Sequence, residues 1–230
     1  MEIKKLNKKV DKFVLYTKNM AKFLKLPNNS WIVVEGSYDQ NSLLDVEIDR
    51  CDSTKAVMYS GVLDLRYGIK ELVEAFELLD EDYELWLTGN GNAVPFIESK
   101  AKENGRIKYF GYLPTRRDLL VKQKQATMLI STRNPEEEAS NYCFPSKIFE
   151  YMLSGNPVIS TRIAGIPEEY FDFLIPIDTV TSEEIAKTIK LVAEKPLEER
   201  KNIGLRGKKF VIENKSNVAQ TKKIVEFINN

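Results

Sequence analysis

The chain has 230 residues, enough for one large domain or for one domain and part of another. Its 34 lysines and arginines balance 34 aspartates and glutamates, so it lacks the general basic field with which many proteins bind nucleic acid. It contains no histidine, which excludes from this chain a Ser-His-Asp triad, a histidine-ligated zinc ion and an imidazole base.

The first part of the chain predicts a short strand–helix–strand unit. Apolar residues at 12–17 and 30–36 predict two strands, with a helix between them at 18–26. The polar stretch 37–55 that follows is typical of a linker rather than of packed structure.

Strands and helices then alternate regularly to residue 195. The predicted strands are short, rich in β-branched residues and apolar throughout: 56–61, 83–89, 107–113, 127–132, 157–161 and 173–177. The predicted helices are amphipathic: 69–79, 93–104, 115–123, the segment after Pro145, 182–195, and two more after residue 196. This alternation predicts an α/β fold with a doubly wound, Rossmann-like parallel sheet.

Ligands of such sheets bind beyond the carboxyl ends of the strands, so the loops there are the first place to look for a site. The turn "GNGNAVP" (89–95) follows a predicted strand, and Gly89 and Gly91 give it accessible backbone amides. It lacks the third glycine of the dinucleotide-binding fingerprint, and no acid follows the next strand. We interpret it as a turn close to a ligand, with an ordinary turn as the alternative.

The helix after Pro145 carries polar residues of opposite charge in its first turns. Ser146 is expected to cap the helix, and free amides at a helix start favour a phosphate group. Lys147 and Glu150 lie on the arc away from the predicted buried residues Ile148, Phe149, Met152 and Leu153. Either Lys147 and Glu150 form a surface ion pair, or Lys147 binds phosphate and Glu150 accepts hydrogen bonds from ribose hydroxyls.

The segment "FPSKIFEYMLSGNPVIST" (144–161) resembles the nucleotide-sugar-binding segment of GT-B glycosyltransferases of the group-one retaining class. The similarity extends over "VMYSGVLDLRYGIKELVEAFELL", "YELWLTGNG", "RIKYFGYLP" and "ATMLIST", in the expected order. The segments "KFVLYTKNMAKFL" and "SWIVVEGSYD" resemble the end of the acceptor-binding domain and the linker after it. The resemblance implies the C-terminal half of a GT-B fold.

This resemblance implies four parts of the chain. Residues 1–38 are expected to be a remnant of an N-terminal acceptor-binding domain, and residues 39–55 a linker. Residues 56–200 are expected to form the nucleotide-sugar-binding Rossmann-like domain. Residues 201–230 are expected to be C-terminal helices that pack back toward the N-terminal segment.

The family's Glu-x7-Glu motif is present only in part. Glu150 matches the second acid, which implies a contact with the donor ribose. Tyr142 stands where the first acid contacts the donor sugar, so that contact differs here. The acidic run 136–138 is nearby, and we interpret it as a solvated run rather than a substitute. Tyr112 and Leu113 match the stretch that reads the base, with Tyr112 either a stacking partner or a half-buried aromatic residue.

The first glycine loop also departs from the family pattern. Gly61 fits a close backbone approach to the donor, but Val62 and Tyr67 stand where the family has its diphosphate-binding Arg and Lys. Arg66 is the nearest cation and is interpreted either as a phosphate contact or as a surface residue.

The resemblance implies an enzyme, a hexosyltransferase that moves a sugar from a nucleoside diphosphate sugar to an acceptor hydroxyl with retention. UDP-sugar is the expected donor, surface polysaccharide or glycan biosynthesis the expected setting, and neither a metal nor another cofactor is expected. The acceptor is expected to be a glycan or lipid-linked, bound by an N-terminal domain that is mostly missing from this chain. No catalytic residue is assigned, and no nucleic acid partner is expected.

Cys51 and Cys143 are far apart and lack metal-ligand spacing. Together with the absence of a signal peptide, they predict a cytoplasmic location, with the full enzyme at the inner membrane face as a peripheral protein in one interpretation. The alternative function is a stand-alone nucleotide-binding Rossmann module, either an NAD(P)-type oxidoreductase or a non-catalytic nucleotide-sugar-binding subunit.

Overall fold

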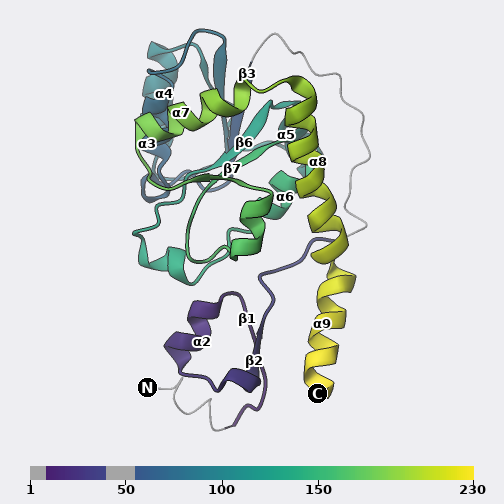
Figure 1. The fold of residues 1–230 in the computed structure, drawn as a ribbon. Helices are drawn as coiled ribbons and strands as arrows, with labels where there is room; N and C mark the ends of the chain where they lie inside the picture. The colour runs from purple at the N-terminus through teal and green to yellow at the C-terminus, as the bar shows by residue number, and fades with distance from the viewer. Residues whose placement is uncertain (1–8, 40–54) are drawn as a thin grey trace.

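A six-stranded parallel sheet forms the centre of the larger part of the molecule, drawn in the upper half of Figure 1. The computed structural model describes residues 9–39 and 55–230. The strands are β3 (Lys55–Ser60), β4 (Tyr83–Thr88), β5 (Ile107–Tyr109), β6 (Met128–Ser131), β7 (Val158–Thr161) and β8 (Ile175–Ile177). Their order is β5-β4-β3-β6-β7-β8, so the chain changes direction across the sheet between β3 and β6. The loops that follow β3 and β6 therefore diverge there, which is the usual binding position of a doubly wound sheet.

Helices cover both faces of this sheet. One face carries α3 (Ile69–Ala75), α4 (Val94–Glu103) and α7 (Ser182–Ala193), whose apolar residues form one core with the sheet. The other face carries α5 (Arg116–Gln125), α6 (Lys147–Leu153) and α8 (Leu197–Asn214), which enclose a second core. Successive strand residues point to opposite faces, so Met58 enters one core and Tyr59 the other. The predicted doubly wound α/β fold is confirmed.

The N-terminal part forms a separate small unit. It contains β1 (Phe13–Leu15), α2 (Lys18–Leu24), the 3-10 turn η1 (Asn28–Ser30) and β2 (Trp31–Val33), with β1 parallel to β2. Three buried residues form its core: Leu15, Ala21 and Leu26. The last helix, α9 (Asn217–Asn229), runs from the end of α8 alongside this unit (Figure 1).

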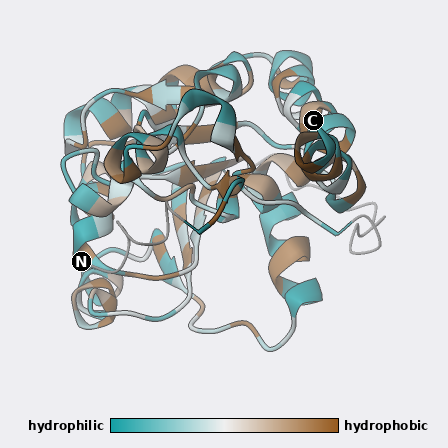
Figure 2. Cartoon of the chain, turned by 90° about the horizontal axis from the view of Figure 1, so that it is seen from below, coloured by the Kyte–Doolittle hydropathy of each residue, from teal (hydrophilic) through white to brown (hydrophobic). Residues whose placement is uncertain are grey.

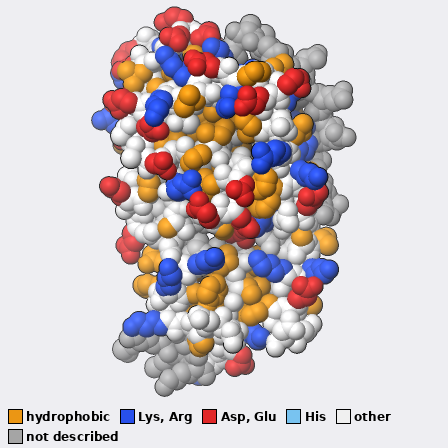
Figure 3. All heavy atoms as spheres, viewed as in Figure 1, with side chains coloured by type: hydrophobic (Ala, Val, Ile, Leu, Met, Phe, Trp, Pro, Cys, Tyr) orange, Lys and Arg blue, Asp and Glu red, His pale blue; other side chains and the backbone are white. Residues whose placement is uncertain are grey.

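Short 3-10 turns shape the loops: η3 (Leu65–Tyr67), η4 (Glu138–Asn141) and η5 (Glu168–Asp172). Apolar residues concentrate on the strands and on the inner helix faces (Figure 2). Charges of both signs are interspersed over the face shown in Figure 3, in line with the balanced composition. Within residues 9–39 and 55–230, every helix is too short or too polar to cross a membrane.

Several predicted elements are longer than the observed ones. The helix predicted at 69–79 ends at Ala75, and turns occupy the remaining residues. The strand predicted at 107–113 ends at Tyr109; the Phe110 amide still donates to the Leu87 carbonyl at 2.9 Å, and the extended backbone then ends at Gly111, whose φ is 63°. Most of the predicted linker, with Cys51, lies outside the described residues.

Candidate functional site

A cavity of about 560 Å³ opens at the carboxyl ends of β3 and β4, beside the point where the strand order reverses. Three loops and the start of α5 surround it: 60–62, 88–90, 112–116 and Leu119. Its volume falls within the range of small-molecule sites, and most of its lining is apolar. Gly61, Gly89, Tyr112 and Leu113, all candidates from the sequence, meet here.

Backbone contacts between two glycine turns form the floor of this cavity. Gly89 has a φ of 130°, and a Cβ atom there would lie 1.8 Å from the carbonyl oxygen of Gly61. The Gly61 amide donates a hydrogen bond to the Thr88 carbonyl at 3.0 Å. A side chain at residue 89 would push the two turns apart, so the sequence needs glycine at this position.

Gly91 has a different role. A Cβ atom at Gly91 would lie 2.1 Å from the Leu63 carbonyl oxygen, and that carbonyl accepts a hydrogen bond from the Ala93 amide at 2.9 Å. Gly91 therefore brings the start of α4 against the loop after β3. It lines neither this cavity nor the neighbouring one beside Tyr59 and Lys147.

A second cavity, of about 220 Å³, adjoins the first at Val62, which lines both. The loop before α6 forms one wall, and Tyr59, Tyr67 and Arg133 form the others. The wall from α6 includes the predicted candidates Ser146 and Lys147. The two cavities thus lie next to each other at the switch point.

The ammonium group of Lys147 enters this second cavity. Its Nζ atom lies 3.7 Å from the centre of the Tyr59 ring, and a Cβ atom at Gly61 would lie 3.2 Å from it. Burial, and secondarily the positive charge of Arg133, lowers the pKa of Lys147 to about 7. Among the described residues no carboxylate forms an ion pair with Lys147, so its charge is left uncompensated.

Arg133 supplies a second cation from the loop after β6. Its Nε atom donates a hydrogen bond to the Ser140 hydroxyl at 3.2 Å, and its guanidinium lies 4.8 Å from the centre of the Tyr67 ring. Within the described parts of the chain, the residues that line this cavity include two cations and no acid. Such a cavity favours an anion with several oxygens.

The start of α6 differs from the prediction in one respect. Ser146 is at the cap position, but its side chain makes no capping hydrogen bond. Its φ and ψ of −55° and −27° are already helical, whereas a capping side chain needs an extended backbone. The predicted Ser146 cap is therefore wrong, and the Pro145 carbonyl accepts from the Ile148 amide instead, at 2.9 Å.

The helical-wheel prediction for α6 also needs correction. Lys147 was expected on the outer arc, yet its side chain turns toward Tyr59 in the core-facing cavity. Tyr151, absent from the predicted buried set, is fully buried; its hydroxyl accepts from the Ser60 amide at 2.8 Å and donates to the Ser60 carbonyl at 3.0 Å. This pair of bonds fixes α6 to the end of β3.

Glu150 lies at the rim of the first cavity. One of its carboxylate oxygens is 3.7 Å from a guanidinium nitrogen of Arg116, which lines that cavity. Its side chain is 34% exposed, so a ligand can reach the carboxylate. The alternative surface pair between Lys147 and Glu150 is not formed, because the two side chains point to different cavities.

Besides Gly91, two predicted residues lie away from both cavities. Arg66 is held by the carboxylate of Asp64, with Nε at 3.0 Å and Nη2 at 2.8 Å, and its side chain is 63% exposed. Tyr142 packs edge-on against Phe23 of α2, with ring centres 5.6 Å apart. The structure therefore brings seven of the ten candidates to the site, if Glu150 at the rim is counted with the lining residues, and leaves Arg66, Gly91 and Tyr142 aside.

Three residues at the site were not predicted from the sequence: Tyr59, Arg116 and Arg133. Arg133 lies in the loop after β6, and Arg116 is the first residue of α5, just after the loop that follows β5, so their position after a strand was the available signal. Tyr59 lies inside β3 and gave no signal, because a buried aromatic residue in a strand is ordinary core.

Residues 46–210 match the family described as glycosyl transferases group 1. No match was found among curated proteins. The solved structure of Anabaena Alr3699/HepE in complex with UDP-glucose is similar, with a TM-score of 0.75 and 16% identity over 95% of this chain and 64% of that one. S. aureus TarM, in complex with UDP, has a TM-score of 0.77 and 15% identity over 97% of this chain and 45% of that one.

The C-terminal domain of the glycosyl transferase group 1 protein LpcC from Francisella tularensis has a TM-score of 0.64 and 16% identity over 78% of this chain and 99% of that one. This chain thus spans less than two thirds of HepE and less than half of TarM. At these identities the likeness shows the fold, which matches the Rossmann-like C-terminal domains of GT-B glycosyltransferases. The family match covers well over half of the chain. The chain therefore belongs to the glycosyl transferases group 1 family.

Proposed function

We propose that this chain is the donor-binding half of a retaining glycosyltransferase and that it binds a UDP-sugar across the two adjoining cavities. The observation that carries the proposal is the cationic cavity, where the ammonium of Lys147 and the guanidinium of Arg133 face a space without a carboxylate. A diphosphate supplies the missing negative charge. The larger, mostly apolar cavity next to it then takes the nucleoside.

The same arrangement supports chemistry at the diphosphate. When the bond between the sugar and the diphosphate breaks, negative charge accumulates on the leaving phosphate oxygens. Lys147 and Arg133, held in place by α6 and by Ser140, stabilise that charge without moving. Since burial disfavours the charged form of Lys147, the ammonium interacts more strongly with an anion here than it would in water.

Glu150 is proposed to accept hydrogen bonds from the two ribose hydroxyls. It lies beside the first cavity, with a carboxylate oxygen 3.7 Å from Arg116, which lines that cavity, so the ribose of a nucleoside bound there comes within its reach. Tyr112, which is 85% exposed, is proposed to cover the base from the solvent side. The peptide groups of Tyr112 and Leu113 line the same cavity and offer a hydrogen-bonding edge to the base.

No metal is expected to take part, and this stays a prediction. Within the described residues no three His, Cys, Asp or Glu side chains are grouped as metal ligands. We expect UDP to bind equally well with EDTA and with added Mg²⁺. A strong dependence of binding on Mg²⁺ would contradict the proposed role of Lys147 and Arg133.

The finer features of the reaction are proposals as well. HepE has been crystallised with UDP-glucose and with UDP and glucose, and WaaB is described as a lipopolysaccharide outer core galactosyltransferase. These neighbours support a hexosyl donor and a surface glycan or lipid-linked acceptor. The extra length of HepE and TarM supports an acceptor-binding domain that adjoins the β1–β2 unit.

The alternative of an NAD(P)-binding module requires the Gly89–Gly91 turn to hold the phosphates. Both glycines are instead used to bring backbone segments together, Gly89 against Gly61 and Gly91 against Leu63. The observed site therefore favours the nucleotide-sugar proposal.

Calorimetric titration of the full chain with UDP, UDP-glucose and NADPH tests the proposal. We expect UDP to bind, Lys147→Ala to weaken its binding at least about tenfold, and Glu150→Ala to weaken the binding of UDP but not that of 2′,3′-dideoxy-UDP, which lacks both ribose hydroxyls. Lys201→Ala, an exposed lysine of α8, is the matched control and should leave binding unchanged. Tight NADPH binding that neither Lys147→Ala nor Glu150→Ala changes would contradict the proposal.

A further inference from the structure

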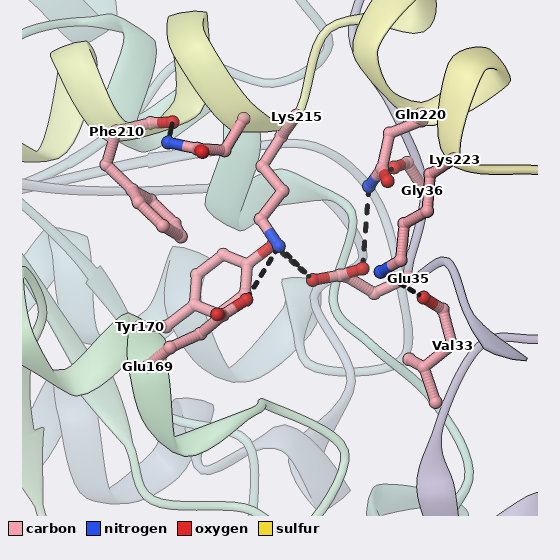
Figure 4. Close-up of polar contacts among 10 residues, drawn as sticks. Val33, Glu35, Gly36, Glu169, Tyr170, Phe210, Lys215, Gln220 and Lys223 are labelled. Carbon is pink, nitrogen blue, oxygen red and sulfur yellow. Dashed lines mark hydrogen bonds and ion pairs between the residues drawn. The ribbon is translucent and has the colours of Figure 1, made fainter. Parts of the chain in front are cut away.

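A buried charged cluster joins three segments that are far apart in the sequence (Figure 4). Glu35 follows β2, Tyr170 belongs to η5, and Lys215 stands between α8 and α9. The Lys215 ammonium lies 2.6 Å from the Glu35 carboxylate, and the Tyr170 hydroxyl donates to that carboxylate at 2.9 Å. The Glu35 and Lys215 side chains are 2% and 7% exposed, so the ion pair is removed from water.

Further contacts connect the cluster to α9. The Gln220 side chain donates to the Gly36 carbonyl at 2.9 Å, and the Lys223 ammonium donates to the Val33 carbonyl at 2.8 Å (Figure 4). The cluster is therefore the place where the β1–β2 unit is fastened to the two C-terminal helices.

The cluster also touches the wall of the cationic cavity. The Tyr170 ring lies 5.1 Å from the ring of Phe144, which lines that cavity. Phe144 in turn lies 4.9 Å from Phe149 of α6, and a Cβ atom at Gly36 would be 3.0 Å from the Phe149 ring. A short, fully packed path thus leads from Glu35 to the first turn of α6, which carries Lys147.

A buried ion pair is a weak source of net stability, since apolar side chains of similar size usually do as well in its place. The ion pair between Glu35 and Lys215 instead favours one relative position of the three segments, because the two side chains meet only in that position. A shift of the β1–β2 unit would leave the Glu35 carboxylate without its partners in the interior.

We propose that Glu35, Tyr170 and Lys215 are positioning residues for the diphosphate pocket, and that they couple the β1–β2 unit to donor binding through Phe144 and Phe149. The inference rests on the proposed function, because it takes UDP as the ligand of that pocket. Coupling is reciprocal, so UDP that orders the wall of the pocket also stabilises the cluster.

The test uses the full chain and the double variant Glu35→Gln with Lys215→Met, which removes both charges at similar volume. Hydrogen–deuterium exchange is followed at residues 31–36 and 144–150 with and without UDP, together with UDP affinity and thermal unfolding. In the wild type, UDP is expected to slow exchange in both segments. In the double variant, UDP is expected still to slow exchange at 144–150 but no longer at 31–36. The Kd for UDP is expected to rise about tenfold.

Two further variants keep the test decisive. Tyr170→Phe removes the hydroxyl and keeps the ring, so it should fold normally and raise the Kd for UDP about threefold. Lys209→Met with Glu213→Gln removes an exposed pair on α8 and should change neither exchange nor affinity.

The outcomes separate the two proposals. Absence of UDP binding to the wild type would overturn the proposed function and this inference with it. The inference alone would be overturned if the wild type binds UDP but the variants behave like it. In that case Tyr170→Phe and any folded double variant would show an unchanged Kd for UDP and an unchanged slowing of exchange at 31–36.

Discussion

At the scale of single residues, Lys147 shows how position sets chemistry. Its ammonium is placed against the Tyr59 ring and near Arg133, and burial and the like charge together lower its pKa to about 7. A lysine on an open helix surface keeps a pKa near 10.4, so the same residue type at the predicted outer arc would carry a constant charge. The cavity makes its charge depend on pH near neutrality.

Binding of UDP-glucose is therefore expected to depend on pH. Its diphosphate favours the charged lysine, so affinity should be constant below about pH 7 and fall up to about tenfold per pH unit above it. Calorimetry in buffers of different ionisation enthalpy should show proton uptake on binding at pH 8. Lys147→Arg, whose charge is permanent, should bind without proton uptake; uptake that persists in this variant would assign it to another group.

At the scale of elements, α8 depends on a glycine that helix propensity alone would disfavour. A Cβ atom at Gly204 would lie 2.1 Å from the Gly155 carbonyl oxygen in the turn between α6 and β7. Gly204 thus lets α8 approach the turn after α6 closely, and, further along, α8 contributes Val211 to the second core. Gly207, one turn further along the same helix, has more space, since its nearest neighbour is a flexible Met152 side chain at 3.4 Å.

This contrast gives a paired prediction. Gly204→Ala should destabilise the protein by about 1–3 kcal/mol, because the backbone of the turn must move, although alanine is the better helix former. Gly207→Ala should be neutral or stabilise by up to about 1 kcal/mol. Urea denaturation followed by circular dichroism measures both values. Equal effects of the two substitutions would show that the approach of α8 to the turn at Gly155 is not tight.

At the scale of the whole molecule, residues 9–39 are joined to the rest of the chain by charged and polar contacts. Lys12 donates to the Phe227 carbonyl at 3.2 Å, Thr17 to the Asn141 carbonyl at 3.4 Å, and Glu35 pairs with Lys215 at 2.6 Å. Burial alone would raise the pKa of Glu35, but the hydrogen bonds and charge of Lys215 outweigh it, with help from Tyr170, so that the pKa is lowered.

The lowered pKa predicts how Glu35 affects acid stability. The stabilisation is present above the ordinary pKa of about 4.5 and is lost as pH falls through the lower pKa of the folded state. Glu35→Gln should lower the free energy of unfolding by about 3 kcal/mol or less at pH 7, since Glu169 still pairs with Lys215 at 2.7 Å. The difference from wild type should shrink by up to about 1.4 kcal/mol per pH unit below pH 4.5. Thermal unfolding from pH 7 to pH 3 checks this; a constant difference would mean that Glu35 keeps an ordinary pKa.

The sequence by itself determined the alternation of strands and helices, and with it the sheet and the edge where ligands bind. This was possible because buried strands and amphipathic helices leave local patterns of period 2 and 3.6. It also placed Gly61, Gly89 and Lys147 in loops and helix starts at that edge, since the ends of parallel strands share one side of the sheet.

Only the tertiary structure decided which side chains meet. Tyr59 of β3 and Arg133 of the loop after β6 lie beside Lys147, Arg116 of α5 lies beside Glu150, and Tyr142 packs against Phe23 rather than in the cavities. Glu35 and Lys215, separated by 180 positions, form a buried pair because α9, which begins just after Lys215, runs alongside the β1–β2 unit. Local patterns record which face of an element is buried but not which distant element covers it, because the free energy of such contacts arises only when the segments pack together.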